Sequence, residues 1–579
     1  MKRRTIWIPV IAAMLLLGGI SALSDARSRG LVENSLWLVA VTLAISIPIG
    51  TAIAVALGRT DARLRRIVAV ALGIMLVVPL YLHAAGWEAG FGMSGWFTEV
   101  TAAPYQAGLL SGWRGAVWVH GMAAIPWMVL IVGTAVRFVE PELEEAALLD
   151  CSAWRVLLHV TLRRALPAIG VAAVWIAVGV ATEMTVTDIF QTPGVGLRTY
   201  AEEIYTDFAL GTDPGPPPGA AIGVAVTGVL AACGLMLCLA AASWTPPTAR
   251  TPLVFRLGRS RGLVSLGLLL AAAAIFGVPL VSLIVKAGES VTHSAAGFSR
   301  GWSAAEGLKI LVESPVRFRW EIGWSALIAV VAASGVLALA VPIGWIARRR
   351  DGIGLLVKVA AVSLSAAALA VPGPLVGIGL IKVFNAPGAV PLVNAQGPKT
   401  EAAPQAKPGK PDTVPLTTPR DYIAVVLNFL YDRTILVAAI GQAVRAFPLC
   451  MLIVWHALNT VPADLLEAAA LDGAGAWTRL ARIVLPLRWP ALAFAWLAAF
   501  VVAIGELAAT ILVIPPGVTT LGVRISQLLH FNIQNELAGL CLILMAAAAV
   551  LAGTMVVLAG RSGTTERAQS PGNADERLL

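Results

Sequence analysis

Three carboxylates lie within long apolar segments of this 579-residue chain, namely Glu183, Asp188 and Glu506. Charged side chains are costly at membrane depth, so they usually mark a route for an ion or a substrate. In that interpretation the three side chains lie beside a translocation path. A second interpretation, which the pattern supports equally, places them near the outer surface of the membrane, where they are solvated or hold helix ends.

One cation also interrupts an apolar run, since Arg445 lies in the middle of residues 434–458. The long stem of an arginine allows its guanidinium group to reach the membrane surface. Pairing with a buried carboxylate is the alternative, and the sequence leaves both options open.

The residues do not indicate an enzyme. The strings Gly397–Thr400 and Gly409–Pro411 are the nearest to a phosphate-binding loop, and neither has the spacing Gly-x-x-x-x-Gly-Lys-Ser/Thr. No nucleophile–base pair and no metal-ligand cluster stands out. We therefore expect no catalytic residue, no metal site and no cofactor in this chain, and any ATP that drives it must bind to a partner subunit.

The composition indicates that lipid is the solvent for most of the chain. Hydrophobic residues make up 58% of it and charged residues only 13%, with a mean hydropathy of +0.82. A soluble protein carries about a quarter charged residues. The net charge of +9 does not indicate nucleic-acid binding, because the basic residues occur in short clusters between apolar runs. We expect an all-α polytopic protein of the cell's inner (plasma) membrane.

Apolar runs long enough to cross a bilayer recur about twelve times, since a span needs about 20 apolar residues. The first run follows a basic N-terminus and has no convincing cleavage site, so we interpret it as an uncleaved span. The runs lie near residues 5–24, 35–57, 67–86, 115–137, 168–190, 218–241, 262–286, 323–347, 354–380, 434–458, 490–514 and 537–560.

Basic clusters predict the orientation of these spans. The cluster Lys2–Arg4 places the N-terminus in the cytoplasm, and an even number of spans places the C-terminus there too. The loops that this orientation makes cytoplasmic are rich in arginine. The lysine-containing stretch 388–420 is an exception, which we assign to the outside because long segments are exported regardless of charge. The Arg-rich loops lie at residues 59–66, 137–164, 250–261, 348–350 and 479–488.

Two copies of one pattern make up the chain, so we expect two parallel six-helix repeats. The first half spans residues 1–250 and the second spans 251–561, with a disordered insertion at about 394–420 and a cytoplasmic tail at 562–579. The matched pairs are Pro48-Ile-Gly50 with Pro342-Ile-Gly344, Val78-Pro79 with Val371-Pro372, Pro126 with Pro448, Glu145 with Glu467, Glu183 with Glu506, and Thr187 with Thr510.

One matched cytoplasmic loop predicts a short helix, a turn and a second helix. In the second copy, Pro462 suits a helix start and Gly473 suits the left-handed residue that ends a helix. The residues between them favour helix, and their small side chains allow a protein partner to approach closely. The positions concerned are Glu467, Ala468, Ala469, Asp472, Gly473 and Pro486 in the second loop, and Glu145, Ala146, Ala147 and Cys151 in the first.

This loop resembles the cytoplasmic EAA signature of permease subunits of ATP-binding-cassette importers. The second loop has Glu-Ala-Ala, a glycine four positions later, nine residues and then Ile-x-Leu-Pro. The first loop departs from the signature, because Cys151 replaces the glycine, Arg163 replaces the proline and one residue is missing. Both halves resemble the family's core, so the resemblance covers nearly the whole chain.

The resemblance implies a type I importer permease fold and a set of partners. Each cytoplasmic loop would act as a coupling helix that docks into a separate ATPase subunit, so two ATPase copies are expected. A periplasmic or extracellular solute-binding protein would deliver the substrate, and the halves would alternate access across the lipid bilayer. No nucleic acid is expected as a partner.

The segment from Glu506 to Ile525 resembles that of ferric-iron permeases, which are often fused in this way. Thiamine permeases fit the fused length, and polyamine, sulfate and phosphonate permeases share the scaffold. Two other classes remain open. An ion-coupled secondary transporter would use Glu183, Asp188 and Glu506 as coupling carboxylates, and a membrane scaffold would not transport at all.

Overall fold

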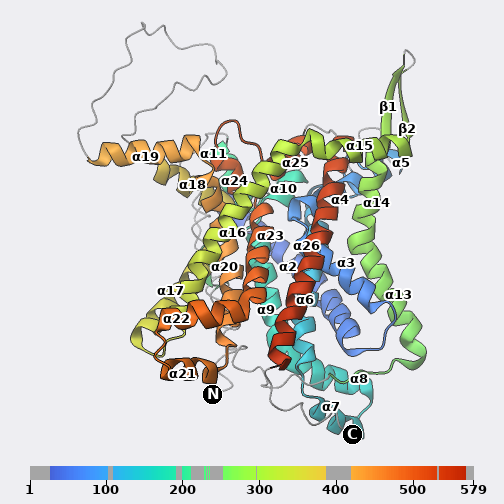
Figure 1. Ribbon diagram of the computed structural model, residues 1–579. Helices are drawn as coiled ribbons and strands as arrows, with labels where there is room; N and C mark the ends of the chain where they lie inside the picture. Colours follow the sequence, from blue (N-terminus) through green and yellow to red (C-terminus); the bar gives the residue numbers. More distant parts are fainter. Residues whose placement is uncertain are drawn as a thin grey trace.

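The computed structural model describes most of the chain as helix (Figure 1). Within the described residues, nine helices are long and apolar enough to cross a membrane, or ten if one bent pair counts as a span. The predicted all-α polytopic fold is confirmed. The predicted span near 5–24 lies outside the described residues, and the span near 218–241 lies largely outside them. The described ranges are 26–101, 108–190, 198–209, 252–294, 297–385, 419–530 and 534–568, with single positions between 224 and 234.

Each half is built on three helices that pack closely together. In the first half these are α2 (Ala26–Arg59), α6 (Gly112–Arg137) and α9 (Leu162–Ala181). In the second half they are α16 (Arg319–Ala347), α20 (Leu436–Asn459) and α23 (Leu485–Ile504). The order of the helices along the chain is the same in both sets, as the internal repeat predicts.

Glycines of the repeated Pro-Ile-Gly triplet allow the close approach within each set. A Cβ atom on Gly50 would lie 2.5 Å from Met128 Cγ of α6, and a Cβ on Gly344 would lie 3.0 Å from Leu458 Cδ1 of α20. Small residues at helix interfaces are the usual means of close packing in membranes. The repetition of this triplet therefore has a packing cause.

Two predicted spans are broken helices, which corrects the expectation of continuous spans over 67–86 and 354–380. Helix α3 (Arg65–Val77) is followed by α4 (Leu80–Phe91), and the segment that begins with α4 is bent by 110° from α3. Helix α17 (Gly352–Ala370) is followed in the same way by α18 (Gly373–Phe384). Each break falls at a Val-Pro pair, because a proline forces the residue before it out of the helical conformation.

The spans predicted over 168–190 and 490–514 also end early. Helix α9 stops at Ala181 and a short helix α10 (Thr185–Ile189) follows, whereas α23 stops at Ile504 and α24 (Thr510–Val513) follows. The matched carboxylates occupy these two gaps, so they lie between helices and not on a continuous span.

Helices from the second half of the chain pack against helices of the first half. The first described span of the second half consists of α13 (Arg261–Ala272), a π-helical turn and α14 (Val278–Ala287), and it packs against α3 and α4 of the first half. The last helix, α26 (Gln534–Ala568), lies against the same pair (Figure 1). A Cβ atom on Gly86 of α4 would lie 2.8 Å from Pro279 Cβ of α14, so this contact is tight.

Two aspartates hold the loops that precede α3 and α17. The Leu257 N–H donates to Asp61 Oδ1 at 2.9 Å, and this hydrogen bond lowers the pKa of the Asp61 carboxyl, with Arg261 adding to the effect. The Gly354 N–H donates to Asp351 Oδ1 at 2.9 Å and lowers the pKa of that carboxyl in the same way. Asp351 thereby caps the N-terminus of α17.

Short elements cover the end of the bundle that lies opposite α7 (Pro141–Asp150) and α21 (Ala463–Leu471) (Figure 1). They include α15 (Ala304–Arg317), whose start is capped by Ser303, and an antiparallel hairpin of two strands. The other short elements are α5 (Trp96–Thr101), α11 (Tyr200–Ala209), α19 (Pro419–Arg433), α25 (Leu521–His530), and the strands β1 (Glu289–Ser294) and β2 (Gly297–Trp302).

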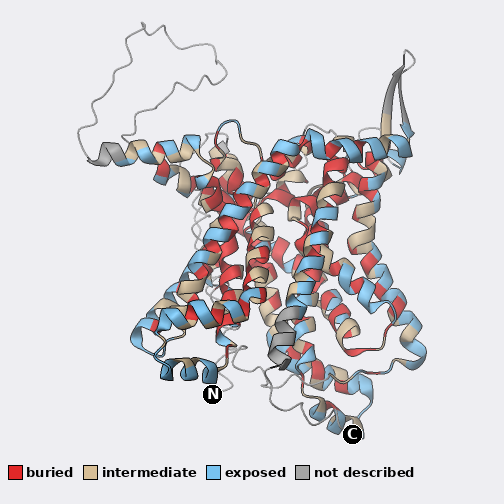
Figure 2. Cartoon of the chain, viewed as in Figure 1, coloured by how far each residue is buried: buried red, intermediate tan, exposed pale blue. Residues whose placement is uncertain are grey.

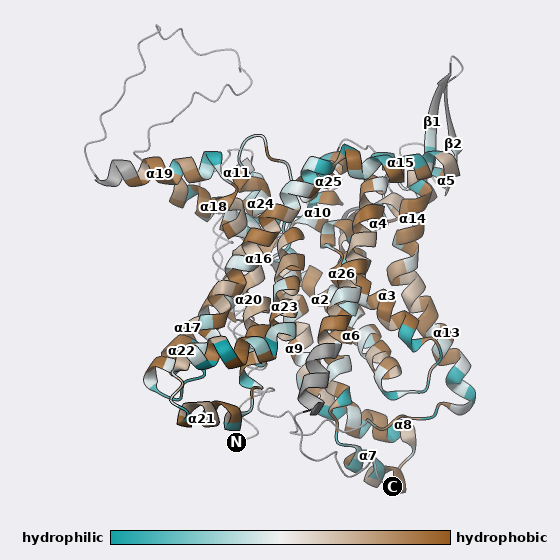
Figure 3. Ribbon diagram, in the orientation of Figure 1, coloured by the Kyte–Doolittle hydropathy of each residue, from teal (hydrophilic) through white to brown (hydrophobic). Residues whose placement is uncertain are grey.

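Exposed side chains along the outer faces of the spans are largely apolar, whereas the buried residues gather between the helices (Figures 2 and 3). Leu263 of α13 is 75% exposed, Leu356 of α17 is 70% exposed and Val550 of α26 is 70% exposed. Such faces suit contact with lipid.

The predicted insertion over 394–420 falls outside the described residues, except for Pro419 and Arg420, which begin α19. Helix α26 continues to Ala568, past the predicted start of the tail at residue 562. The rest of that tail lies outside the described part of the chain, as does the predicted boundary between residues 250 and 251.

Candidate coupling and translocation sites

The second of the two matched loops folds as the sequence predicts. Helix α21 begins directly after Pro462 and is followed by α22 (Ala476–Arg479). Gly473 adopts the left-handed conformation with φ of 83°, and its N–H donates to the Ala470 carbonyl at 3.0 Å. The Ala474 N–H donates to the Ala469 carbonyl at 2.9 Å. These two hydrogen bonds form a Schellman motif, which requires a residue such as glycine at the turn.

The first loop makes its turn without a left-handed residue. Helix α7 ends at Asp150, and Cys151 is extended with φ of −133°. Helix α8 (Ala153–Val156) then starts after Ser152. An extended residue needs no glycine, so this backbone explains both the cysteine and the missing residue in this copy.

Helices α7 and α21 lie at the same end of the bundle (Figure 1). Each presents a large apolar side chain at the matched position before the turn, since Leu149 is 87% exposed and Leu471 is 90% exposed. Trp154 of α8 and Trp477 of α22 form a second matched pair of exposed side chains. Sequence reasoning missed these residues, although their recurrence in both copies was a visible signal.

The predicted coupling residues differ in burial between the two loops. Glu145 and Ala146 are exposed and Ala147 is half-buried, whereas the neighbouring Glu144 is fully buried. In the second loop, Glu467, Ala468 and Ala469 lie on a helix with no buried residue, and Asp472 and Gly473 are exposed beside it. Pro486 lies in the first turn of α23.

The carboxylates of Glu183 and Glu506 accept hydrogen bonds from backbone N–H groups at the start of the short helix that follows each of them. The backbone N–H groups of Thr185 and Val186 donate to the Glu183 carboxylate at 2.6 and 3.0 Å. The Ala509 N–H donates to Glu506 Oε1 at 2.9 Å. The sequence left open whether these carboxylates hold helix ends or line a path. The structure shows the capping contacts, and it places both carboxylates where the halves meet.

Arg445 contacts Glu506 and residues of both halves. Its Nε lies 3.3 Å from Glu506 Oε2, and one terminal nitrogen donates to the carbonyls of Ala368 and Val371 at 3.2 and 3.0 Å. The other terminal nitrogen lies 3.4 Å from Thr182 Oγ1 of the first half. Of the two options that the sequence left open for Arg445, the structure shows the pairing with a largely buried carboxylate.

In the described part of the chain, no arginine pairs with the matched carboxylate of the first half, Glu183. The nearest basic side chain that pairs with Glu183 in the described structure is His120, whose Nε2 lies 3.7 Å from Glu183 Oε2. Asp188 lies on α10, which packs against α11. Of the three predicted carboxylates, Asp188 therefore lies on a short helix, whereas Glu183 and Glu506 lie in the gaps before α10 and α24.

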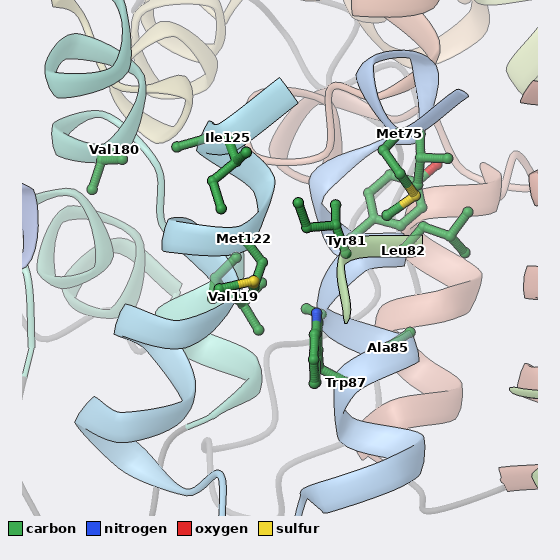
Figure 4. Close-up of a cluster of buried hydrophobic side chains, with 14 of the residues drawn as sticks. Met75, Tyr81, Leu82, Ala85, Trp87, Val119, Met122, Ile125 and Val180 are labelled. Atoms are coloured by element: carbon green, nitrogen blue, oxygen red, sulfur yellow. The ribbon is translucent and has the colours of Figure 1, made fainter. Parts of the chain in front are cut away.

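The breaks of the two halves lie against each other. The Tyr81 hydroxyl donates to the Ile504 carbonyl at 3.4 Å, and a Cβ atom on Gly505 would lie 3.5 Å from Pro79 Cβ. Behind this contact, residues of α4 face residues of α6 in an apolar cluster that Figure 4 shows, with Tyr81 beside Met75. This packing fixes the position of the bent pair α3–α4.

Within the described residues, no group of three or more His, Cys, Asp and Glu side chains could hold a metal ion. The predicted site residues fall into two groups, one at the end of the bundle that carries α7 and α21 and one beside the broken helices.

Residues 15–245 and 340–561 match the family described as binding-protein-dependent transport system inner membrane component. Each matched segment contains the three packed helices of one half, or most of them, and together they cover most of the chain. The chain therefore belongs to this family, as a multi-pass membrane permease component.

Two curated relatives show local similarity. The putative 2-aminoethylphosphonate transport system permease protein PhnV of Salmonella paratyphi A is 34% identical over 106 residues, which are 18% of this chain and 40% of that protein. The trehalose transport system permease protein SugA of Mycobacterium tuberculosis is 39% identical over 61 residues, 10% of this chain and 20% of that protein. The chain thus spans less than half the length of these relatives, and their names do not refer to iron.

Proposed function

We propose that this chain is the translocation subunit of an ATP-driven importer, with both permease halves in one polypeptide. The observation that carries the proposal is the pair of short helices α7 and α21 at one end of the bundle, each followed by a turn and each presenting a matched leucine and tryptophan. Exposed apolar side chains in such a cluster suit a protein interface.

Two copies of a separate ATPase subunit would dock on these helices and supply the ATP hydrolysis. The solute-binding protein would dock at the opposite end, beside α11 and α25. In this arrangement the end that carries α7 and α21 faces the cytoplasm, and both termini lie there. Glu183 and Glu506 would line the path that opens when the halves separate at the broken helices.

We propose ferric iron as the cargo, on the basis of the segment from Glu506 to Ile525. An organic phosphonate is the second candidate, and the 34% identity to a 2-aminoethylphosphonate permease protein favours it. Competition decides between them: uptake of radioactive iron in cells that express the whole importer should resist excess 2-aminoethylphosphonate. Uptake of the phosphonate, with no uptake of iron, would reverse the assignment.

The energy source separates this proposal from an ion-coupled transporter. Uptake should stop when cellular ATP is depleted and should continue when a protonophore is added to cells whose ATP is maintained. The reverse result, uptake that survives ATP depletion and collapses with the protonophore, would instead assign Glu183, Asp188 and Glu506 to ion coupling.

A further inference from the structure

A buried ion pair fastens the first cytoplasmic helix to the membrane bundle. Glu144 of α7 contacts Arg59, the last residue of α2, and both side chains are fully buried. The second oxygen of the carboxylate accepts a hydrogen bond of 2.6 Å from the Thr161 hydroxyl. Helix α7, the end of α2 and the start of the following span are thereby held together.

The same end of α2 is fastened to the beginning of the second half. The Phe255 N–H donates to the Arg59 carbonyl at 2.8 Å, and the Arg59 guanidinium lies 6.0 Å from the Phe255 ring. The Arg261 Nε donates to the Asp61 carbonyl at 2.8 Å, and the Arg63 N–H donates to Ser265 Oγ at 2.8 Å. Arg261 and Ser265 belong to α13, so the chain of contacts from α7 leads into a span of the opposite half.

The second cytoplasmic helix has no comparable fastening in the described structure. Leu466 occupies the position that matches Glu144, and α21 has no buried residue. Arg479 reaches α21 only through the Leu466 carbonyl, at 3.3 Å, and Arg488 reaches the Thr460 carbonyl before the helix. These two contacts involve backbone oxygens within the same loop.

Resting on the proposed function, we propose that Arg59 and Glu144 are positioning residues that transmit movement of the ATPase docked on α7 to α13 of the opposite half. A buried ion pair adds little net stability, but removal of one partner leaves a costly unpaired charge. The pair therefore favours one fixed geometry over other arrangements. Within it, α7, the end of α2 and α13 move as one body.

The experiment uses the whole complex of permease, ATPase and solute-binding protein in proteoliposomes, with ferric iron or 2-aminoethylphosphonate as the probe. Three forms are compared with the wild type: Glu144→Gln, the exchanged pair Arg59→Glu with Glu144→Arg, and the control Glu140→Gln. Glu140 lies in the same loop and forms an exposed pair with Arg164 at 3.6 Å, so its loss should have little effect.

Two measurements report coupling and not merely folding. One is the stimulation of ATP hydrolysis by the loaded solute-binding protein, relative to the basal rate. The other is the distance between spin labels at the exposed positions Leu143 of α7 and Leu263 of α13, in a cysteine-free background, with and without nucleotide. In the wild type we expect strong stimulation and a distance that nucleotide does not change.

For Glu144→Gln we expect the ATPase to copurify and to keep its basal rate, while stimulation falls about tenfold, within the usual range of coupling between sites. The label distance should then change with nucleotide, and the exchanged pair should restore both readouts. Normal stimulation in Glu144→Gln would overturn the inference. So would a loss of ATPase binding that the exchanged pair does not restore, because the pair would then serve folding only. Failure of the wild-type chain to copurify the ATPase would instead refute the proposed function.

Discussion

The two halves share their breaks and their carboxylates but differ in the cation at the centre. The register that pairs Pro126 with Pro448 also pairs His120 with Gln442 and Ala123 with Arg445. In the second half, Arg445 contacts the carboxylate that follows the broken span, whereas in the first half a histidine lies nearby at 3.7 Å. Duplication has therefore preserved the backbone of the site, while the charges have diverged.

The backbone carbonyl four residues before the proline of each break has no N–H partner in its own helix, because proline has no N–H. The two halves satisfy this carbonyl with different side chains. The register that pairs the two Val-Pro breaks also pairs Met75 with Ala368. Arg445 donates to the Ala368 carbonyl, whereas the Met75 carbonyl lies 3.1 Å from Nε2 of the buried His83. Each half thus satisfies the same backbone group, as buried carbonyls require, but with a different side chain. Only the arginine also reaches across to the other half.

Replacement of Arg445 by alanine should have the largest effect. It would leave Glu506, whose side chain is 11% exposed, without its cation and would free the carbonyls of Ala368 and Val371 at the end of α17. Loss of one partner of a buried pair costs about 3–5 kcal/mol. We expect a clear fall in the apparent melting temperature of the purified protein, together with loss of uptake.

The matched change in the first half is His120→Gln, which installs the residue that the second half has there. The Glu183 carboxylate keeps its two backbone hydrogen bonds, so we expect a loss of only about 1 kcal/mol. Equal losses of stability in Arg445→Ala and His120→Gln, measured by the same thermal scan, would contradict the comparison. Both halves would then depend equally on the basic residue beside their carboxylate.

Local rules in the sequence predicted the second cytoplasmic loop well. Pro462 and Gly473 mark the ends of α21, and the left-handed glycine follows from the chemistry of helix ends. Pairing with a carboxylate was one of the two options for Arg445, because a cation in an apolar run must either reach the membrane surface or be paired. The turn depends on residues that are close in sequence. The contact of Arg445 depends on the high free-energy cost of an unpaired charge among apolar residues.

Features that depend on tertiary contacts were missed. Hydropathy counts apolar residues, so it joined α3 to α4 across Val78-Pro79 and α17 to α18 across Val371-Pro372. The Arg59–Glu144 pair joins α2 and α7, which are far apart in sequence, and no local rule predicts that Glu144 is buried while Glu145 is exposed.

Replacement of Gly473 by alanine should have a smaller effect than Arg445→Ala, and the effect should be confined to the second loop. A residue with a Cβ atom costs roughly 1–2 kcal/mol in the left-handed conformation. Cys151→Ala in the first loop should change stability by less than about 0.5 kcal/mol, since Cys151 is extended. Thermal unfolding and ATPase copurification check both variants. A larger loss in the Cys151 variant would show that the two turns are not built differently.

The central claim is that α7 and α21 both bind the ATPase, and its most direct test is copurification of that subunit with charge-reversal variants. Glu145 and Glu467 are exposed at matched positions, so Glu145→Lys and Glu467→Lys reverse one charge on each helix without disturbing the bundle. We predict that each single variant loses part of the bound ATPase and that the double variant loses nearly all of it, together with uptake. Unchanged ATPase binding and uptake in the double variant would contradict the account.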